Sequence, residues 1–168
     1  MRVFVALLPS LASIEKIKPL GVQGSAFHHL SDLHMTLYFL GRRSQQQVLA
    51  LISELESCSM QMAVKWQFDA QAWFPNDQQA KVWALQGGMS PSLQEGVSHL
   101  SRLPSLEISR TFRPHMTLSP FPPNAIGLTM LENNVCIQGE VIFDRLALMQ
   151  SVAGGATRYQ ALWQRELV

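Results

Sequence analysis

Apolar residues fall along this chain in two kinds of run, one typical of strands and one with the spacing of a helix. Val3 to Leu8 is apolar throughout, and its β-branched and aromatic residues predict a buried first strand. Over residues 10–20 the apolar positions instead recur at helical spacing, with Ser10 or Ser13 available as the N-cap. A strand followed by a helix therefore opens the fold.

The same two patterns continue to the end of the chain. Further helices are expected over residues 44–59 and 90–103, and further strands over residues 34–40, 64–74, 80–86, 106–108, 115–119, 135–149 and 159–167. Pro75-Asn76-Asp77 has the residues of a turn and predicts that the strands beside it pair antiparallel. Because no Pro- or Ser-rich linker divides the two strand–helix halves, we expect one α+β domain of two lobes over residues 1–168, and not a doubly wound parallel sheet.

Composition narrows the class of protein. Of the 168 residues, 47% are hydrophobic, which excludes a disordered chain, and 15% are charged, against roughly 25% in an average soluble protein. The formal net charge of +1 does not suit a protein that coats long duplex nucleic acid through many phosphate contacts. A small anion or the end of a nucleic acid remains a suitable ligand.

The cysteines and the N-terminal run indicate the compartment. Cys58 and Cys136 lie far apart with no C-x-x-C spacing, which argues against a zinc cage or a disulfide framework and predicts a reducing, cytoplasmic location. A short signal peptide with Ala12 near its cleavage point is the alternative, but the apolar run reaches Pro9 too soon. No stretch approaches the roughly 20 apolar residues that span a bilayer, so no membrane partner is expected.

A repeated four-residue motif carries the candidate chemistry. His34-Met35-Thr36-Leu37 recurs as His115-Met116-Thr117-Leu118 about half a chain length later, as expected after a gene duplication. Residues i and i+2 of a strand share a face, so His34 points with Thr36, and His115 with Thr117. Met35, Leu37, Met116 and Leu118 should then face the core.

Two imidazoles and two hydroxyls that meet between two lobes suit acid–base work on a phosphate. With an ordinary pKa near 6.5, one imidazole takes a proton from water while the other gives a proton to the leaving oxygen. The Thr hydroxyls can donate to the non-bridging oxygens, where charge develops in the transition state.

Two other interpretations of the repeat stay open. Each His could end a core strand, with each Thr present as an ordinary strand former. The two histidines could also bind zinc, but Asp32 is the only Asp, Glu or Cys within four residues of either copy of the motif. We therefore expect neither a metal nor a cofactor.

The repeat and several flanking segments resemble the 2H phosphoesterase superfamily, and within it the RNA 2′,3′-cyclic phosphodiesterase, or 2′-5′ RNA ligase, family. The resemblance covers the whole chain and rests on residues 1–6, 33–41, 74–75, 80–83, 114–118, 151 and 155–159.

That resemblance implies a fold and an activity. The fold would have two pseudo-symmetric antiparallel-sheet lobes with helices outside and a central cleft. The activity would be metal-independent hydrolysis of a terminal 2′,3′-cyclic phosphate to a 2′-phosphate, on an RNA 3′ end or a cyclic nucleotide. His34 would be the proton donor and His115 the proton acceptor, with Thr36 and Thr117 on the phosphate. A monomer is expected.

One departure from the family pattern concerns phosphate binding. Members of that family often carry a basic residue just after the second copy of the motif, where this chain has Ser119-Pro120. Arg113, which by period-two counting shares the face of His115, is a candidate substitute, and a solvated arginine at the end of a strand is an equal alternative. Arg42 follows the first motif. Tyr38, counted on the face of His34, could stack on a base, although an ordinary aromatic residue of a sheet is the favoured interpretation.

Other functions remain as alternatives. The chain could be a non-catalytic module that binds RNA or nucleotide phosphate, although two titrating imidazoles favour an enzyme. It could also be a 2H enzyme that acts on 2′-5′ linked or nucleotide-sugar cyclic phosphate substrates. The sequence leaves open whether the chain ligates RNA.

Overall fold

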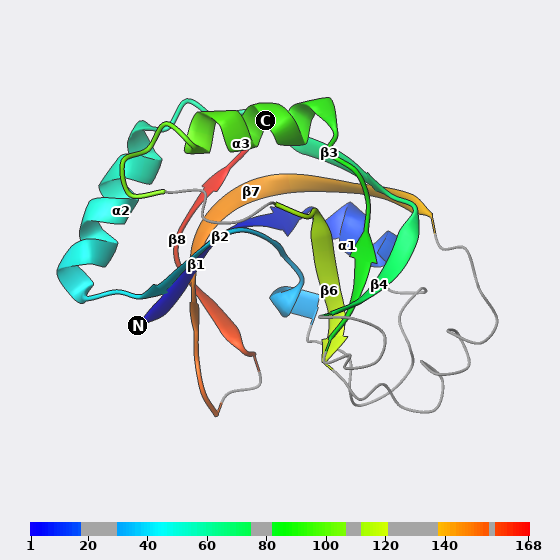
Figure 1. Ribbon diagram of the computed structural model, residues 1–168, viewed down its shortest axis with the longest axis horizontal. Helices are drawn as coiled ribbons and strands as arrows, with labels where there is room; N and C mark the ends of the chain where they lie inside the picture. Colours follow the sequence, from blue (N-terminus) through cyan, green and yellow to red (C-terminus); the bar gives the residue numbers. More distant parts are fainter. Residues whose placement is uncertain (18–29, 75–81, 107–111, 121–137, 155–156) are drawn as a thin grey trace.

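Within the ranges that it describes (residues 1–17, 30–74, 82–106, 112–120, 138–154 and 157–168), the computed structural model has two antiparallel sheets and three α-helices (Figure 1). The strands are β1 (Arg2–Pro9), β2 (Met35–Arg42), β3 (Val64–Phe68), β4 (Ala70–Phe74), β5 (Val82–Gln86), β6 (His115–Pro120), β7 (Gly139–Ser151) and β8 (Tyr159–Glu166). The helices are α1 (Leu11–Ile17), α2 (Gln45–Ser57) and α3 (Pro91–Leu100), with one 3₁₀ turn, η2 (Leu30–Asp32).

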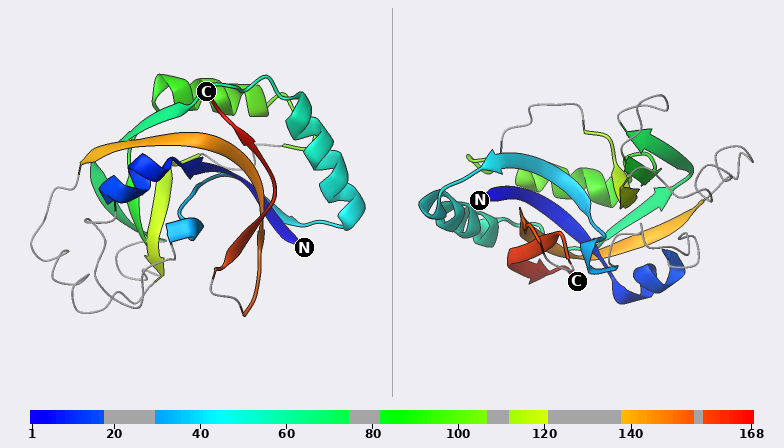
Figure 2. Two further views of the ribbon diagram at one scale, coloured as in Figure 1. Left: turned by 180° about the vertical axis from the view of Figure 1, so that it is seen from behind. Right: turned by 90° about the horizontal axis from the view of Figure 1, so that it is seen from below.

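The two sheets differ in size. The larger sheet has the order β2-β1-β7-β3, with β8 also paired to β7, and the smaller sheet has the order β4-β5-β6. Helices α2 and α3 follow the outer side of the long, curved strand β7, which is clear from two opposite views (Figures 1 and 2). The α+β class, the antiparallel pairing and the outer helices are thus as predicted.

Local sequence signals start the two longer helices where they were expected. The Ser44 side chain accepts a hydrogen bond from the Gln47 amide, and the Gln47 side chain accepts one from the Ser44 amide, which closes a capping box on α2. Ser90 caps α3 through its own side chain, which accepts from the Leu93 amide, ahead of Pro91 in the first turn.

Strand β1 lies between β2 and β7 in the sheet, and side chains packed over both of its faces bury it. One face carries Val3, Val5 and Leu7 into the main core, which α2, α3 and both sheets share. The other face contributes to a second cluster, whose buried members are Phe4, Ala6, Leu8, Ala147 and Met149, with Tyr159 packed against it.

The expected single strand over residues 64–74 is wrong. It divides at Asp69 into β3, which pairs with β7 of the larger sheet, and β4, which pairs with β5 of the smaller sheet. Both halves are good strand formers, and the strands available to pair with them, not their propensity, decide which sheet each half joins. The antiparallel pairing of β4 with β5 is confirmed, while the turn at residues 75–77 lies outside the described residues.

Other expectations fall partly outside the described ranges. The first helix is described as far as Ile17, and the last long strand from Gly139. Of the strand expected over residues 106–108, Leu106 is described, and it is buried without belonging to a strand. Strand β2 continues through Gly41, which has a φ of 70°, instead of ending there.

The end of β5 is packed too closely for any side chain. A Cβ built on Gly87 would lie 2.0 Å from the Gln67 carbonyl oxygen, and the Gly87 amide donates to the Pro114 carbonyl, immediately before His115. Gly87 therefore lets β3, β5 and the start of β6 converge.

We expect Gly87→Ala to lower the free energy of unfolding by about 1–3 kcal/mol, because the methyl group meets backbone that cannot rotate away. Denaturant titration measures this loss. Gly88→Ala is the matched control, because a Cβ there meets nothing within 4 Å. Equal stability of the two variants would contradict the close packing.

Candidate active site

His34 is held in place between η2 and β2. Its Nδ1 lies 2.6 Å from the backbone carbonyl oxygen of Asp32, which can only accept a hydrogen bond, so Nδ1 carries the hydrogen. The ring lies 5.0 Å from that of Phe4 and meets Tyr159 edge-on at 4.8 Å. Proton exchange with a ligand is therefore left to Nε2.

His115 has the same arrangement at the start of β6. Its Nδ1 lies 2.7 Å from the backbone carbonyl oxygen of Arg113, again two residues earlier. Gln86 of β5 is its cross-strand partner, and the Gln86 side chain accepts a hydrogen bond from the Arg113 guanidinium at 3.2 Å. The Arg113 side chain thus lies on the face of His115, as period-two counting predicts.

The threonine in each copy of the motif lies opposite an alanine on the neighbouring strand. Thr36 is opposite Ala6, and Thr117 is opposite Ala84. Thr36 is 8% exposed, and Thr117 is half-buried. The small partners leave room beside both hydroxyl groups.

The apolar residues of the two motifs pack in or against the core between the two sheets. Met35, Met116 and Leu118 have no exposed surface and belong to the main core, and Leu37 packs against that core while partly buried. Strand β2 also contacts β6, so the two motifs lie at neighbouring strands of different sheets, with His34 immediately before β2.

Tyr38 does not lie on the face of His34, and it is an ordinary buried aromatic residue of the sheet, not one that is placed to stack on a base. The β1–β2 register shifts between Val5 opposite Tyr38 and Ala6 opposite Thr36, so Leu37 is an extra residue that reverses the alternation. Tyr38 enters the main core, where its hydroxyl lies 3.5 Å from the Val97 carbonyl and burial raises its pKa.

Phe39 replaces Tyr38 on the face of the histidine. It is 79% exposed, and its ring lies 6.0 Å from that of Phe4, which also contacts His34. The sequence shows two adjacent aromatic residues here, and the bulge decides which of them faces outward.

A buried carboxylate supports the first histidine. Asp32 is 3% exposed, and both of its carboxylate oxygens accept a hydrogen bond from the Arg158 amide at 3.1 Å. That contact holds the start of β8, and hence Tyr159, against His34. Burial raises the pKa of the Tyr159 hydroxyl, so it stays protonated near neutral pH and does not serve as a base there.

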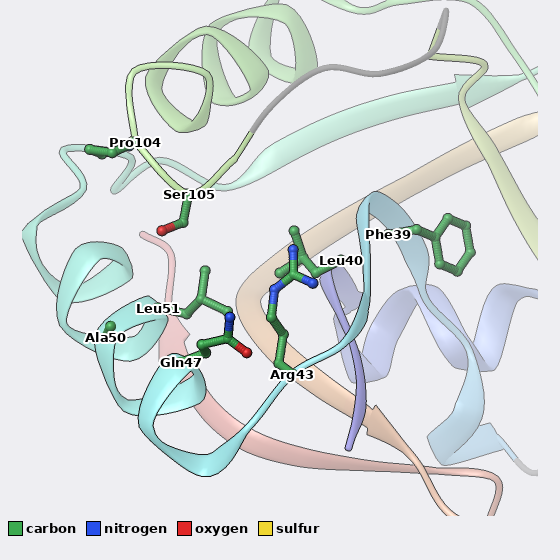
Figure 3. A pocket seen from close by; sticks show the side chains of 8 residues that line it. All are labelled: Phe39, Leu40, Arg43, Gln47, Ala50, Leu51, Pro104 and Ser105. Atoms are coloured by element: carbon green, nitrogen blue, oxygen red, sulfur yellow. The ribbon is translucent and has the colours of Figure 1, made fainter.

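A pocket of about 580 Å³ lies farther along β2, between that strand, α2 and the chain after α3 (Figure 3). Its lining residues are Phe39, Leu40, Arg43, Gln47, Ala50, Leu51, Pro104 and Ser105. Neither histidine lines it. Arg42, the candidate contact from the sequence, is exposed at the end of β2 immediately before Arg43.

Among the described residues, no group of three or more His, Cys, Asp or Glu side chains gathers as a metal-ligand set. Cys58 is a buried free thiol, while Cys136 lies outside the described ranges. In the part of the chain that is described, no helix is long and apolar enough to cross a membrane.

Solved structures share this fold. A phosphoesterase superposes with a TM-score of 0.70 at 21% identity, over 99% of this chain and 97% of its own. E. coli LigT in complex with 3′-AMP gives 0.68 at 21% identity, over 99% and 96%, and TT0787 of Thermus thermophilus gives 0.68 at 19% identity, over 99% and 98%. No protein-family model and no curated protein matches the sequence. The similarity confirms the expected two-lobed fold.

Removing the buried carboxylate should loosen the first histidine. We expect Asp32→Ala to lower the free energy of unfolding by about 1–3 kcal/mol, because the Arg158 amide loses its acceptor. The nitrogen resonances of His34 should also broaden or shift, which NMR detects. Asp69→Ala, at an exposed carboxylate, is the control and should change neither measurement. Unchanged His34 resonances in Asp32→Ala would show that Asp32 does not position the ring.

Proposed function

We propose that this chain is a 2H phosphoesterase that hydrolyses a terminal 2′,3′-cyclic phosphate, on RNA or a nucleotide, to a 2′-phosphate. One observation carries the proposal: two imidazoles, one immediately before β2 and one at the start of the neighbouring strand β6, are anchored alike through Nδ1, each two residues before a threonine. A site that merely captured phosphate would be expected to rely on fixed positive charge or N–H donors. A matched acid and base instead suits proton transfer.

The chemistry divides between the two sides of the phosphorus. His115 Nε2 takes a proton from water as the water oxygen bonds to phosphorus, and His34 Nε2 gives a proton to the 3′ oxygen as its bond to phosphorus breaks. The product is a 3′-hydroxyl and a 2′-phosphate, and the two histidines have exchanged protonation states. The assignment of donor and acceptor comes from the resemblance to the 2H superfamily.

The threonines would hold the phosphate through this exchange. Each hydroxyl can donate to a non-bridging oxygen, where negative charge increases in the transition state. Arg113 lies on the face of His115 and would help to bind the phosphate. In the family that this chain resembles, a basic residue after the second motif would have this role. All of these groups belong to the chain, so the reaction needs neither metal nor cofactor.

The nucleoside would lie on the aromatic side of His34. Phe39 is exposed, and the Phe4 ring lies between it and His34. A base stacked on such a ring gains about 1–3 kcal/mol. E. coli LigT, which shares the fold, was solved with 3′-AMP and with phosphate, and these ligands fit a site for a nucleotide with a terminal phosphate.

Turnover of cyclic phosphates in the presence of a chelator tests the proposal. The chain should convert 2′,3′-cyclic nucleotides to 2′-phosphates with EDTA present, and chromatography of the products identifies the isomer. His34→Ala and His115→Ala should each lower kcat/KM by roughly 10²- to 10⁴-fold, the usual contribution of one acid or base.

His99→Ala is the matched control, because His99 lies on α3 with its Nδ1 2.8 Å from the Ser59 hydroxyl. It should leave kcat/KM unchanged. Saturable nucleotide binding without turnover would favour the non-catalytic module, and loss of activity on chelation, restored by one metal, would refute the mechanism.

A further inference from the structure

An arginine pair lies at the outer end of β1 and β2. Arg2 is directly opposite Arg42 in the strand register, and both side chains are exposed. Like charges directly opposite each other destabilise a sheet. Neither guanidinium is ion-paired to a carboxylate within the part of the chain that is described. The sheet therefore retains two uncompensated cations at one point.

The arginine pair lies on the face of the sheet that carries the candidate site. Phe4 and Ala6 of β1 belong to the second cluster, and the alternation of side chains puts Arg2 on their face. Arg42 shares this face, because directly opposed side chains point the same way. Phe4, the next residue of β1 on that face, contacts His34.

The pair lies well away from Thr36 along the sheet, which favours a separate phosphate for the two arginines. Ala6 is the cross-strand partner of Thr36, and a rise of about 3.3 Å per residue puts Arg2 roughly 13 Å from it along β1. Phe39, opposite Phe4, lies between the two positions. A phosphate at the arginines would belong to a different nucleotide from the one at the histidines.

A pocket lies around the edge strand β2 from the pair, on its α2 side, and neither Arg2 nor Arg42 lines it. Its volume of about 580 Å³ falls within the usual range for small-ligand sites. Arg43, the residue after Arg42, projects between β2 and α2 (Figure 3), and like the pair it has no carboxylate partner among the described residues. Phe39 borders both this pocket and the aromatic side of His34.

From this arrangement we infer a subsite for the RNA upstream of the terminal cyclic phosphate. Arg2 and Arg42 bind backbone phosphates there, on the face of the sheet that carries the candidate site. The inference rests on the proposed function, which it narrows from any cyclic nucleotide to a single-stranded RNA end. Guanidinium groups pair well with phosphate oxygens, and such contacts position a strand without reading its sequence.

The test compares short and long substrates. For the intact chain, kcat/KM should be about tenfold higher for a cyclic-phosphate-ended pentanucleotide than for the cyclic mononucleotide at low salt. In the double variant Arg2→Gln/Arg42→Gln this preference should largely disappear, because kcat/KM falls much more for the pentanucleotide than for the mononucleotide. Lys16→Gln/Lys65→Gln removes the same charge from exposed positions on α1 and β3, and it should keep the preference.

A binding measurement separates this inference from the proposed activity. Fluorescence anisotropy with a labelled pentanucleotide that ends in a 3′-phosphate requires no turnover. Loss of two phosphate contacts should reduce the slope of log K against log salt by about 1.4. Arg2→Lys/Arg42→Lys, which keeps both charges, should retain most of the slope.

The outcomes are distinct. Equal salt slopes and equal length preference in the intact chain and the glutamine variant would overturn the subsite while leaving the hydrolase intact. Slopes that differ as expected, in a chain that hydrolyses no cyclic phosphate, would support the subsite and refute the activity. The thermal midpoint of the glutamine variant should be equal or higher, because opposed charges are removed, and a lower midpoint would give the pair a structural role instead.

Discussion

The hydrogen bond from each imidazole Nδ1 to the carbonyl oxygen two residues earlier determines what the site can do. It fixes the tautomer with the hydrogen on Nδ1, which leaves Nε2 as the nitrogen able to exchange protons, and it holds the ring in place. The two bonds are alike although they come from different sheets. Met35 and Met116, each next to one of the histidines, enter the same core, and β2 and β6 are in contact.

Much of this site follows from the alternation of side chains between the two faces of a strand. The alternation of His34, Met35 and Thr36 predicts that the polar groups share a face and that the methionine is buried, and the same holds from His115 onward. The capping serines, the outer helices and the α+β class also follow from local signals. The roles of donor and acceptor come from the resemblance and remain a proposal.

The remaining features depend on contacts between distant segments. The bulge at Leu37 is set by pairing with β1, and it reverses the faces of Tyr38 and Phe39, which local alternation cannot detect. The contact of Asp32 with the Arg158 amide joins residues from opposite ends of the chain. The division at Asp69 likewise depends on which strands are available for pairing. These are properties of register and packing, not of composition.

The central claim is that the two histidines act on opposite sides of one phosphorus, one as acid and one as base. A cyclic substrate with sulfur in place of the bridging 3′ oxygen tests it, because a thiolate leaves without needing a proton. This substrate should restore much of the kcat/KM lost in His34→Ala and little of that lost in His115→Ala. Equal rescue of both variants, or rescue of His115→Ala alone, would contradict the assigned roles.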